Sequence, residues 1–221
     1  MVSEHLQSIL ATLPREVTLV AVSKFHPARV IQEAYDAGQR DFGESRAQEL
    51  TAKVPLLPGD IRWHFIGPLQ KNKVKYLVPF VWLIHSVDSR DLFLEIVKQA
   101  GKVNRQQRCL LEIKVAQEET KSGWEPAQAE SFLAEYAANP LWQSLVSIQG
   151  IMGIATQTQD TEQIRREFAS LHGLLEGWRN KFPELGLKTL SMGMSGDWPL
   201  AVEEGANMVR IGSAIFGSRG Y

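Results

Sequence analysis

The sequence predicts an α/β protein built as a closed (β/α)8 barrel, in which eight parallel strands alternate with helices. Three observations predict it: short apolar runs recur along the chain, amphipathic stretches separate them, and the connections are short. Each parallel crossover needs a covering helix. A doubly wound open sheet is the structural alternative, but its usual glycine-rich nucleotide fingerprint is missing after the first strand. We therefore prefer the barrel.

The first strand and helix form the clearest repeat. A starter helix precedes them, with apolar residues at helical spacing and a proline as its stop: Leu6, Ile9, Leu10, Leu13 and Pro14. The nearly continuous β-branched run Val17–Ser23 predicts a strand. The helix that follows begins at Pro27 and stops at Gly38.

The same alternation continues to the end of the chain. Further strands are predicted near Asp41–Gly43, Ile61–Ile66, Trp82–His85, Cys109–Val115, Val146–Ile151, Lys188–Ser191 and Met208–Ile211. Helices are predicted near Arg46–Lys53, Asn72–Leu77, Ser89–Gly101, Pro126–Ala138, Thr161–Phe182 and Pro199–Glu204. The stretch after the last strand is too short for a full eighth helix, so the starter helix is expected to cover that side.

Composition excludes several classes of protein. With 24 Lys+Arg against 25 Asp+Glu, the net charge of −1 offers no excess to attract nucleic acid or an anionic membrane. The single cysteine, Cys109, cannot form an internal disulfide, and no signal peptide or membrane-length apolar run is present. We expect a soluble cytoplasmic protein with one domain spanning residues 1–221.

Two glycine- and serine-rich loops follow the seventh and eighth predicted strands, Ser191–Asp197 and Gly212–Gly217. In barrels of this kind the active site lies at the carboxyl ends of the strands, and these two loops often bind phosphate. Glycine lets the backbone approach a ligand, and serine adds a hydroxyl donor. Either loop alone would be explained by turn formation, but together they favour a phosphate site.

Two cationic residues lie at the same predicted end of the barrel. Lys24 follows the first strand and shares the parity of Val20 and Val22, so its amine is expected at the barrel mouth. It either pairs with a carboxylate or acts as the nucleophile of a Schiff base, and position alone leaves both open. Arg210 either forms an ion pair or donates to a ligand acceptor.

The histidines, the cysteine and two polar segments are expected to have structural roles. His64 and His85 are expected to be hydrogen-bonded structural histidines, and Cys109 a small core residue. The histidines show no metal-ligand spacing, so no metal site is predicted. The basic segment Gln70–Lys75 is expected to be a solvated helix face, and Ala116–Trp124 a mobile loop over the mouth.

The motifs occur together in an order that resembles the pyridoxal phosphate homeostasis protein family. They are Val22–Lys24, Phe42–Glu44, Trp63–Lys73, His85–Asp88, Met192–Asp197 and Val209–Ser213, and they span nearly the whole chain. The resemblance implies a modified TIM barrel, like the N-terminal domain of bacterial alanine racemases, that binds pyridoxal 5′-phosphate (PLP).

The resemblance also implies individual roles. Lys24 matches the lysine that holds PLP as an internal aldimine, and Arg210 matches the arginine facing the pyridine nitrogen. The phosphate-loop positions are matched by Ser195, Gly212 and Ser213, with Gly193 nearby. Ser45 stands where the family usually has asparagine, which puts a direct side-chain contact with the cofactor from this position in question.

Three functions are compatible with this pattern. The first is a non-catalytic PLP-binding protein of vitamin B6 homeostasis and amino-acid and keto-acid balance, acting as a monomer with PLP-dependent apo-enzymes as candidate partners. The second is a PLP-dependent amino-acid racemase, which needs a second acid or base opposite Lys24. Alanine racemases supply a tyrosine from a further β domain that is expected to be absent here. The third and weakest is a Schiff-base aldolase acting on a phosphorylated sugar.

Overall fold

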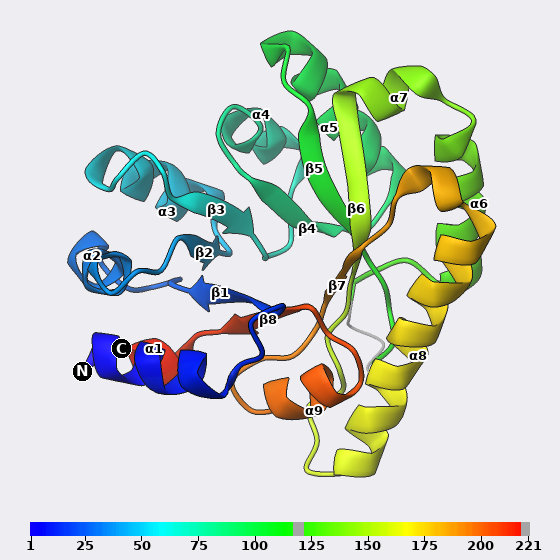
Figure 1. The fold of residues 1–221 in the computed structure, drawn as a ribbon. Coiled ribbons are helices and arrows are strands. Elements are labelled where there is room, and N and C mark those ends of the chain that lie inside the picture. Colours follow the sequence, from blue (N-terminus) through cyan, green and yellow to red (C-terminus); the bar gives the residue numbers. More distant parts are fainter. Residues whose placement is uncertain (117–121, 218–221) are drawn as a thin grey trace.

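Eight parallel strands close a barrel in chain order in the computed structural model, which describes residues 1–116 and 122–217 (Figure 1). The strands are β1 (Thr18–Val22), β2 (Asp41–Glu44), β3 (Arg62–Phe65), β4 (Leu83–Val87), β5 (Gln107–Glu112), β6 (Val146–Met152), β7 (Thr189–Ser191) and β8 (Met208–Ile211). Ala21 of β1 pairs with Phe42 on one side and with Ile211 on the other, which closes the barrel. The predicted fold class is confirmed.

Helices surround the barrel on its outer face (Figure 1). They are α1 (Val2–Thr12), α2 (Ala28–Asp36), α3 (Ala47–Lys53), α4 (Val74–Leu77), α5 (Arg90–Val103), α6 (Pro126–Ala137), α7 (Pro140–Leu145), α8 (Thr161–Lys181), α9 (Trp198–Glu203) and α10 (Ser213–Phe216). Short 3-10 turns lie at Val54–Leu56, Lys71–Lys73 and Pro183–Leu185. Within the two described ranges, no helix has the length and apolar character needed to cross a membrane.

Two predicted boundaries differ clearly from the structure, and one helix was missed, for identifiable reasons. The helix expected over Asn72–Leu77 begins as a 3-10 turn and becomes α-helical only at Val74. The fifth strand ends at Glu112, because Ile113 forms an isolated bridge with Trp124 instead. Helix α7 was missed, although Asn139 caps it by accepting a hydrogen bond from the Trp142 N–H at 3.1 Å.

The N-terminal helix covers the side of the barrel that lacks a full eighth helix. Helix α10 has only one turn, and α1 lies beside it (Figure 1, blue and red). The imidazole Nδ1 of His5 lies 3.1 Å from the Ile215 carbonyl oxygen, which joins the two helices. The expected substitution of the starter helix for a longer eighth helix is therefore confirmed.

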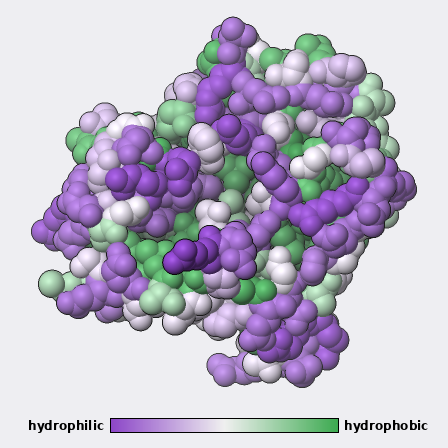
Figure 2. Space-filling model, in the orientation of Figure 1, coloured by the Kyte–Doolittle hydropathy of each residue, from purple (hydrophilic) through white to green (hydrophobic). Residues whose placement is uncertain are grey.

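The apolar core has two parts of very different size. The large part lies between strands and helices and holds most of the aromatic residues, among them Phe42, Phe93 and Trp178. The small part lies inside the barrel and consists of Val20, Leu83, Leu110, Met152 and Met208. On the face shown in Figure 2, most of the surface is hydrophilic, and apolar side chains lie in hollows between polar ones.

A tight turn at Gly193 leads the chain out of β7 and into α9. Its φ of +91° is a conformation that L side chains rarely adopt, and an added Cβ would lie 2.6 Å from the Ala201 Cβ. The Gly193 carbonyl oxygen accepts a hydrogen bond from the backbone N–H of Arg210 at 2.9 Å, so the turn is also bound to β8. Gly193 therefore fixes the course of the loop that follows it.

Replacing Gly193 with alanine should lower the free energy of unfolding by about 2–4 kcal/mol, because backbone strain and overpacking add together. Gly186→Ala is the matched control, since Gly186 also has positive φ (+59°) but no atom lies within 4 Å of its added Cβ. That control should lose only about 1–2 kcal/mol. Urea denaturation of both variants measures the difference, and equal losses would contradict the packing role of Gly193.

Candidate functional site

The end of β1 and the loop after β8 lie side by side. A Cβ added to Gly212 would lie 3.2 Å from both the Cβ and the carbonyl oxygen of Val22. Lys24, two residues further along, is half-buried. The His26 ring packs 5.1 Å, centroid to centroid, from that of Phe216. The structure thus places the segment that carries Lys24 beside the loop after β8.

A largely buried ion cluster contacts Ser23 and Phe25, the residues on either side of this lysine. The Lys53 ammonium donates to Glu44 Oε1 at 2.7 Å, to Glu49 Oε1 at 2.6 Å and to the Ser23 carbonyl oxygen at 3.0 Å. The Ser23 hydroxyl donates to Glu44 Oε1 at 2.7 Å. Burial raises the pKa of Glu44, although Lys53 and Ser23 oppose that shift. The cluster is held by burial and hydrogen bonds together, so its members stay fixed.

The same cluster holds the backbone on both sides of Lys24. The Ser23 carbonyl accepts from Lys53, and the Phe25 N–H donates to Glu49 Oε1 at 2.6 Å. Phe25 has a φ of +69°, which is uncommon for a residue with a side chain. Sequence reasoning missed Lys53 and Glu49, because a glutamate and a lysine four residues apart on a helix usually indicate a surface ion pair.

The loops after β7 and β8 meet at the Ser195 hydroxyl. Its oxygen accepts the backbone N–H groups of Gly212 at 3.2 Å and Ala214 at 3.4 Å. Ser213 lies between these two donors and is exposed. The structure therefore brings Ser195, Gly212 and Ser213 together, whereas Gly193 lies behind them as a buried turn residue.

Arg210 lies inside the barrel, where it is only 4% exposed. Its Nη1 donates to the carbonyl oxygen and the hydroxyl of Ser191 at 2.8 and 2.7 Å, and its Nη2 donates to the Gly153 carbonyl at 3.0 Å. Burial lowers the pKa of Arg210 to about 10, against the opposing influence of Glu112 and Asp197. The guanidinium is therefore still a cation at neutral pH.

A cavity of about 490 Å³ lies between the loops that follow β6 and β7. Thr156 and Thr158 line one side, and Met194 and Asp197 line the other. Its volume lies in the range of small-molecule sites. It is not lined by Lys24 or by the loop after β8, so it shares only one loop with the predicted site.

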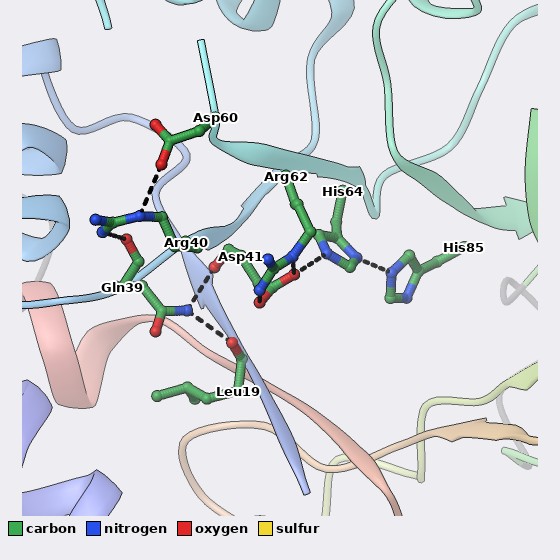
Figure 3. Close-up of polar contacts among 8 residues, drawn as sticks. All are labelled: Leu19, Gln39, Arg40, Asp41, Asp60, Arg62, His64 and His85. Atoms are coloured by element: carbon green, nitrogen blue, oxygen red, sulfur yellow. Dashed lines mark hydrogen bonds and ion pairs between the residues drawn. The ribbon is translucent and has the colours of Figure 1, made fainter. Parts of the chain in front are cut away.

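The remaining candidates have structural surroundings. His64 and His85 are buried and hydrogen-bonded to each other, as expected for structural histidines (Figure 3). Cys109 is fully buried, and burial raises the pKa of its thiol. Ser45 packs against Gly67, whose added Cβ would lie 2.4 Å from the Ser45 carbonyl oxygen. The predicted loop Ala116–Trp124 lies largely outside the described residues.

Over nearly its whole length, the chain is similar to proteins that share one family name. The family model of the alanine racemase N-terminal domain matches residues 2–220. A pyridoxal phosphate homeostasis protein of Aquifex aeolicus is 43% identical over 92% of this chain and 87% of its own length. One of Synechocystis is 40% identical over 96% of this chain and 95% of its own length.

Solved structures of related proteins are also similar to this chain. PipY of Synechococcus elongatus with PLP bound has a TM-score of 0.90 and 40% identity, covering 98% of this chain and 100% of its own. An alanine racemase of Streptomyces lavendulae has a TM-score of 0.78 at 17% identity, which shows a shared fold alone, and this chain covers 59% of its length. The chain therefore belongs to the pyridoxal phosphate homeostasis protein family, within the wider family of the alanine racemase N-terminal domain.

Proposed function

We propose that this protein binds PLP through Lys24 at the carboxyl end of the barrel and serves PLP homeostasis without catalysing a reaction. The observation that carries the proposal is the juxtaposition of the Lys24 strand end with the Gly212 loop, where two N–H groups and the Ser195 hydroxyl converge. The PLP bound to PipY, a relative at 40% identity, supports the choice of ligand.

The converging donors suit a phosphate group. Gly212 and Ala214 direct N–H groups to one oxygen atom, that of the Ser195 hydroxyl. A phosphate oxygen is a stronger acceptor than a hydroxyl, so it would take these donors while Ser195 and Ser213 turn their own hydroxyls to it. The residues present therefore fit a phosphate monoester, and we assign Ser195, Gly212 and Ser213 to it.

The surroundings of Lys24 suit a covalent role. PLP supplies an aldehyde, with which a primary amine condenses with loss of one water molecule. The ion cluster of Glu44, Glu49 and Lys53 binds the Ser23 carbonyl and the Phe25 N–H, so the backbone that carries the amine is held from both sides. The backbone of Lys24 is therefore preorganised, which avoids part of the ordering cost of binding.

Arg210 sets the electronic character expected of the site. We place its guanidinium opposite the ring nitrogen of PLP, where a fixed cation disfavours protonation of that nitrogen. The ring is then a weaker electron sink than one paired with a carboxylate. This arrangement favours storage or transfer of the cofactor over extensive carbanion chemistry.

The racemase alternative requires a second proton-transfer group opposite Lys24. Among the described residues, the tyrosines Tyr35, Tyr76 and Tyr136 all lie in the outer helices. The Tyr136 hydroxyl donates to the Val146 carbonyl oxygen at 2.8 Å, which gives it a structural role. We therefore propose a monomeric, single-domain cytoplasmic carrier over residues 1–221 that can pass PLP to apo-enzymes.

Replacing Lys24 with alanine should abolish the visible absorbance of the PLP-loaded protein, because the amine that binds the aldehyde is lost. Borohydride treatment of the wild type followed by peptide mapping should place the label on Lys24. The control Lys71→Ala, at an exposed lysine paired with Asp91, should keep both signals. A label on another lysine would overturn the assignment.

Removing both hydroxyls in Ser195→Ala/Ser213→Ala should weaken PLP retention by about tenfold or more per hydroxyl, since each hydrogen bond to a charged group contributes about 1.5 kcal/mol or more. Equilibrium dialysis followed by absorbance gives the retained fraction. Ser144→Ala is the control, because that exposed hydroxyl donates to the Leu141 carbonyl of its own helix. Equal retention in all three proteins would exclude these hydroxyls as phosphate donors.

Replacing Glu49 with alanine should slow the reaction of Lys24 with added PLP several-fold, because the Phe25 N–H loses its acceptor while the Lys53–Glu44 pair stays intact. Stopped-flow absorbance measures this rate, and circular dichroism reports whether the fold is kept. The exposed Glu33→Ala serves as the matched control. An unchanged rate in Glu49→Ala would show that the clamped backbone is irrelevant to binding.

A further inference from the structure

A chain of hydrogen bonds crosses the barrel interior from Asp41 to Arg210. Asp41 Oδ1 lies 3.0 Å from His64 Nε2, and His64 Nδ1 lies 2.9 Å from His85 Nε2. His85 Nδ1 lies 3.1 Å from the Ser191 hydroxyl, which accepts from Arg210 Nη1 at 2.7 Å. Figure 3 shows its first half, from Asp41 through His64 to His85. We call these five residues the relay.

The relay joins opposite ends of the barrel. Asp41 is the first residue of β2, at the amino ends of the strands, whereas Arg210 lies one residue before the end of β8. All five residues are buried, and His85 and Ser191 have no exposed surface. Barrels of this type usually fill their interior with branched aliphatic side chains. A continuous polar path in that place needs an explanation beyond packing.

The chemistry of the two end groups determines which member of each hydrogen bond in the relay is the donor. An arginine can only donate hydrogen bonds, and a carboxylate can only accept them. Each group between them both donates and accepts when the imidazoles are neutral. The only assignment that satisfies every contact has His64 donating to Asp41, His85 donating to His64, and Ser191 donating to His85. The Ser191 oxygen then presents its lone pairs to Arg210.

The charges are consistent with that direction. Burial by itself would raise the pKa of Asp41, but hydrogen bonds from Arg62 and His64 lower it below its usual value. Burial, His64 and Arg210 lower the pKa of His85 well below its usual value. At neutral pH the relay therefore has an anionic end, a neutral His85 and a cationic end.

We propose that Asp41 is a positioning residue that acts through His64, His85 and Ser191 to help fix the Arg210 guanidinium opposite the ring nitrogen of PLP. The proposal rests on the proposed function, because it takes Arg210 to be the residue that faces the ring nitrogen. Asp41 sets the tautomer of His64, His64 sets that of His85, and His85 orients the Ser191 hydroxyl. Arg210 thereby keeps one of its three acceptors, the Ser191 hydroxyl, in one orientation.

The opposite direction would fail at both ends. With the protons reversed, the unprotonated His64 Nε2 would face the Asp41 carboxylate, and lone pairs would oppose each other. At the other end Ser191 would receive two donors, from His85 and Arg210, and its own proton would lose its partner in His85. Neutralising Asp41 removes the first of these penalties, so the reversed direction becomes more accessible. The guanidinium then loses the fixed orientation of one of its three acceptors, the Ser191 hydroxyl, while the carbonyl oxygens of Ser191 and Gly153 remain.

The test replaces Asp41 with asparagine, which keeps the volume and can either accept or donate, and with alanine, which removes the acceptor. Asp60→Asn is the matched control, because Asp60 belongs to the same end of the barrel but bonds outside the relay. It pairs with Arg40 (Figure 3) and accepts the Tyr35 hydroxyl. Nitrogen-15 NMR of histidine-labelled protein without cofactor gives the tautomers of His64 and His85. Absorbance and dialysis of PLP-loaded protein give the effect at the ring.

The wild type should show single tautomers, with His64 and His85 each protonated at Nε2. Both Asp41 variants should show mixed tautomers, a shifted absorbance maximum and about fivefold faster loss of PLP, the factor expected for one weakened hydrogen bond. Asp60→Asn should match the wild type. If Asp41→Asn is folded but Asp41→Ala is not, the former carries the test by itself.

Two results would overturn the proposal, and they are distinguishable from failure of the proposed function. Unchanged tautomers in the Asp41 variants would show that Asp41 does not set the relay. Mixed tautomers with an unchanged spectrum and retention would show that the relay does not reach the ring. A wild type that never acquires an absorbance with PLP would instead refute the proposed function, and the role of the relay toward the ring with it.

Discussion

The pairing of β1 with β8 is the constraint on which the rest of the structure depends. It sets Ala21 against Ile211, and thereby brings the segment that carries Lys24 beside the Gly212 loop, almost two hundred residues later in the chain. A parallel open sheet of the same strands would leave these segments at opposite edges. Closure also buries Arg210 inside the barrel, where its charge is held by carbonyl and hydroxyl oxygens. The site is thus a consequence of closing the sheet.

Most of the apolar packing that stabilises the barrel lies outside it, between the strands and the surrounding helices. Most large apolar side chains lie between strands and helices, and the inner cluster is small. Polar side chains occupy the remaining interior, and each buried donor or acceptor there must find a partner to avoid a desolvation penalty of about 1–3 kcal/mol. The relay from Asp41 to Arg210 meets that requirement, and its hydrogen bonds also have a defined order of donors and acceptors. The same hydrogen bonds therefore give the buried polar groups their partners and, in our proposal, position Arg210.

Much of the fold could be predicted, because period and turn chemistry are local properties. The first strand, the long helix α8 and the alternation as a whole follow from the spacing of apolar residues, and Pro27 and Gly38 mark a helix correctly to within two residues. Helices α7 and α10 were missed because four to six residues are too few to show a period. At the site, Lys24 and the two loops were predicted from their place after strands, whereas Lys53 and Glu49 resembled an ordinary surface pair.

The sequence by itself determined the order of the strands and of the longer helices, the family, and the residue types that gather at the carboxyl ends of the strands. Only the tertiary structure decided which of these residues face each other. His64 and His85 each look like isolated histidines in apolar strands, and Ser191 looks like a strand terminus. Their connection arises because barrel closure turns side chains from five different strands toward one axis, and sequence spacing contains no record of distances across that axis.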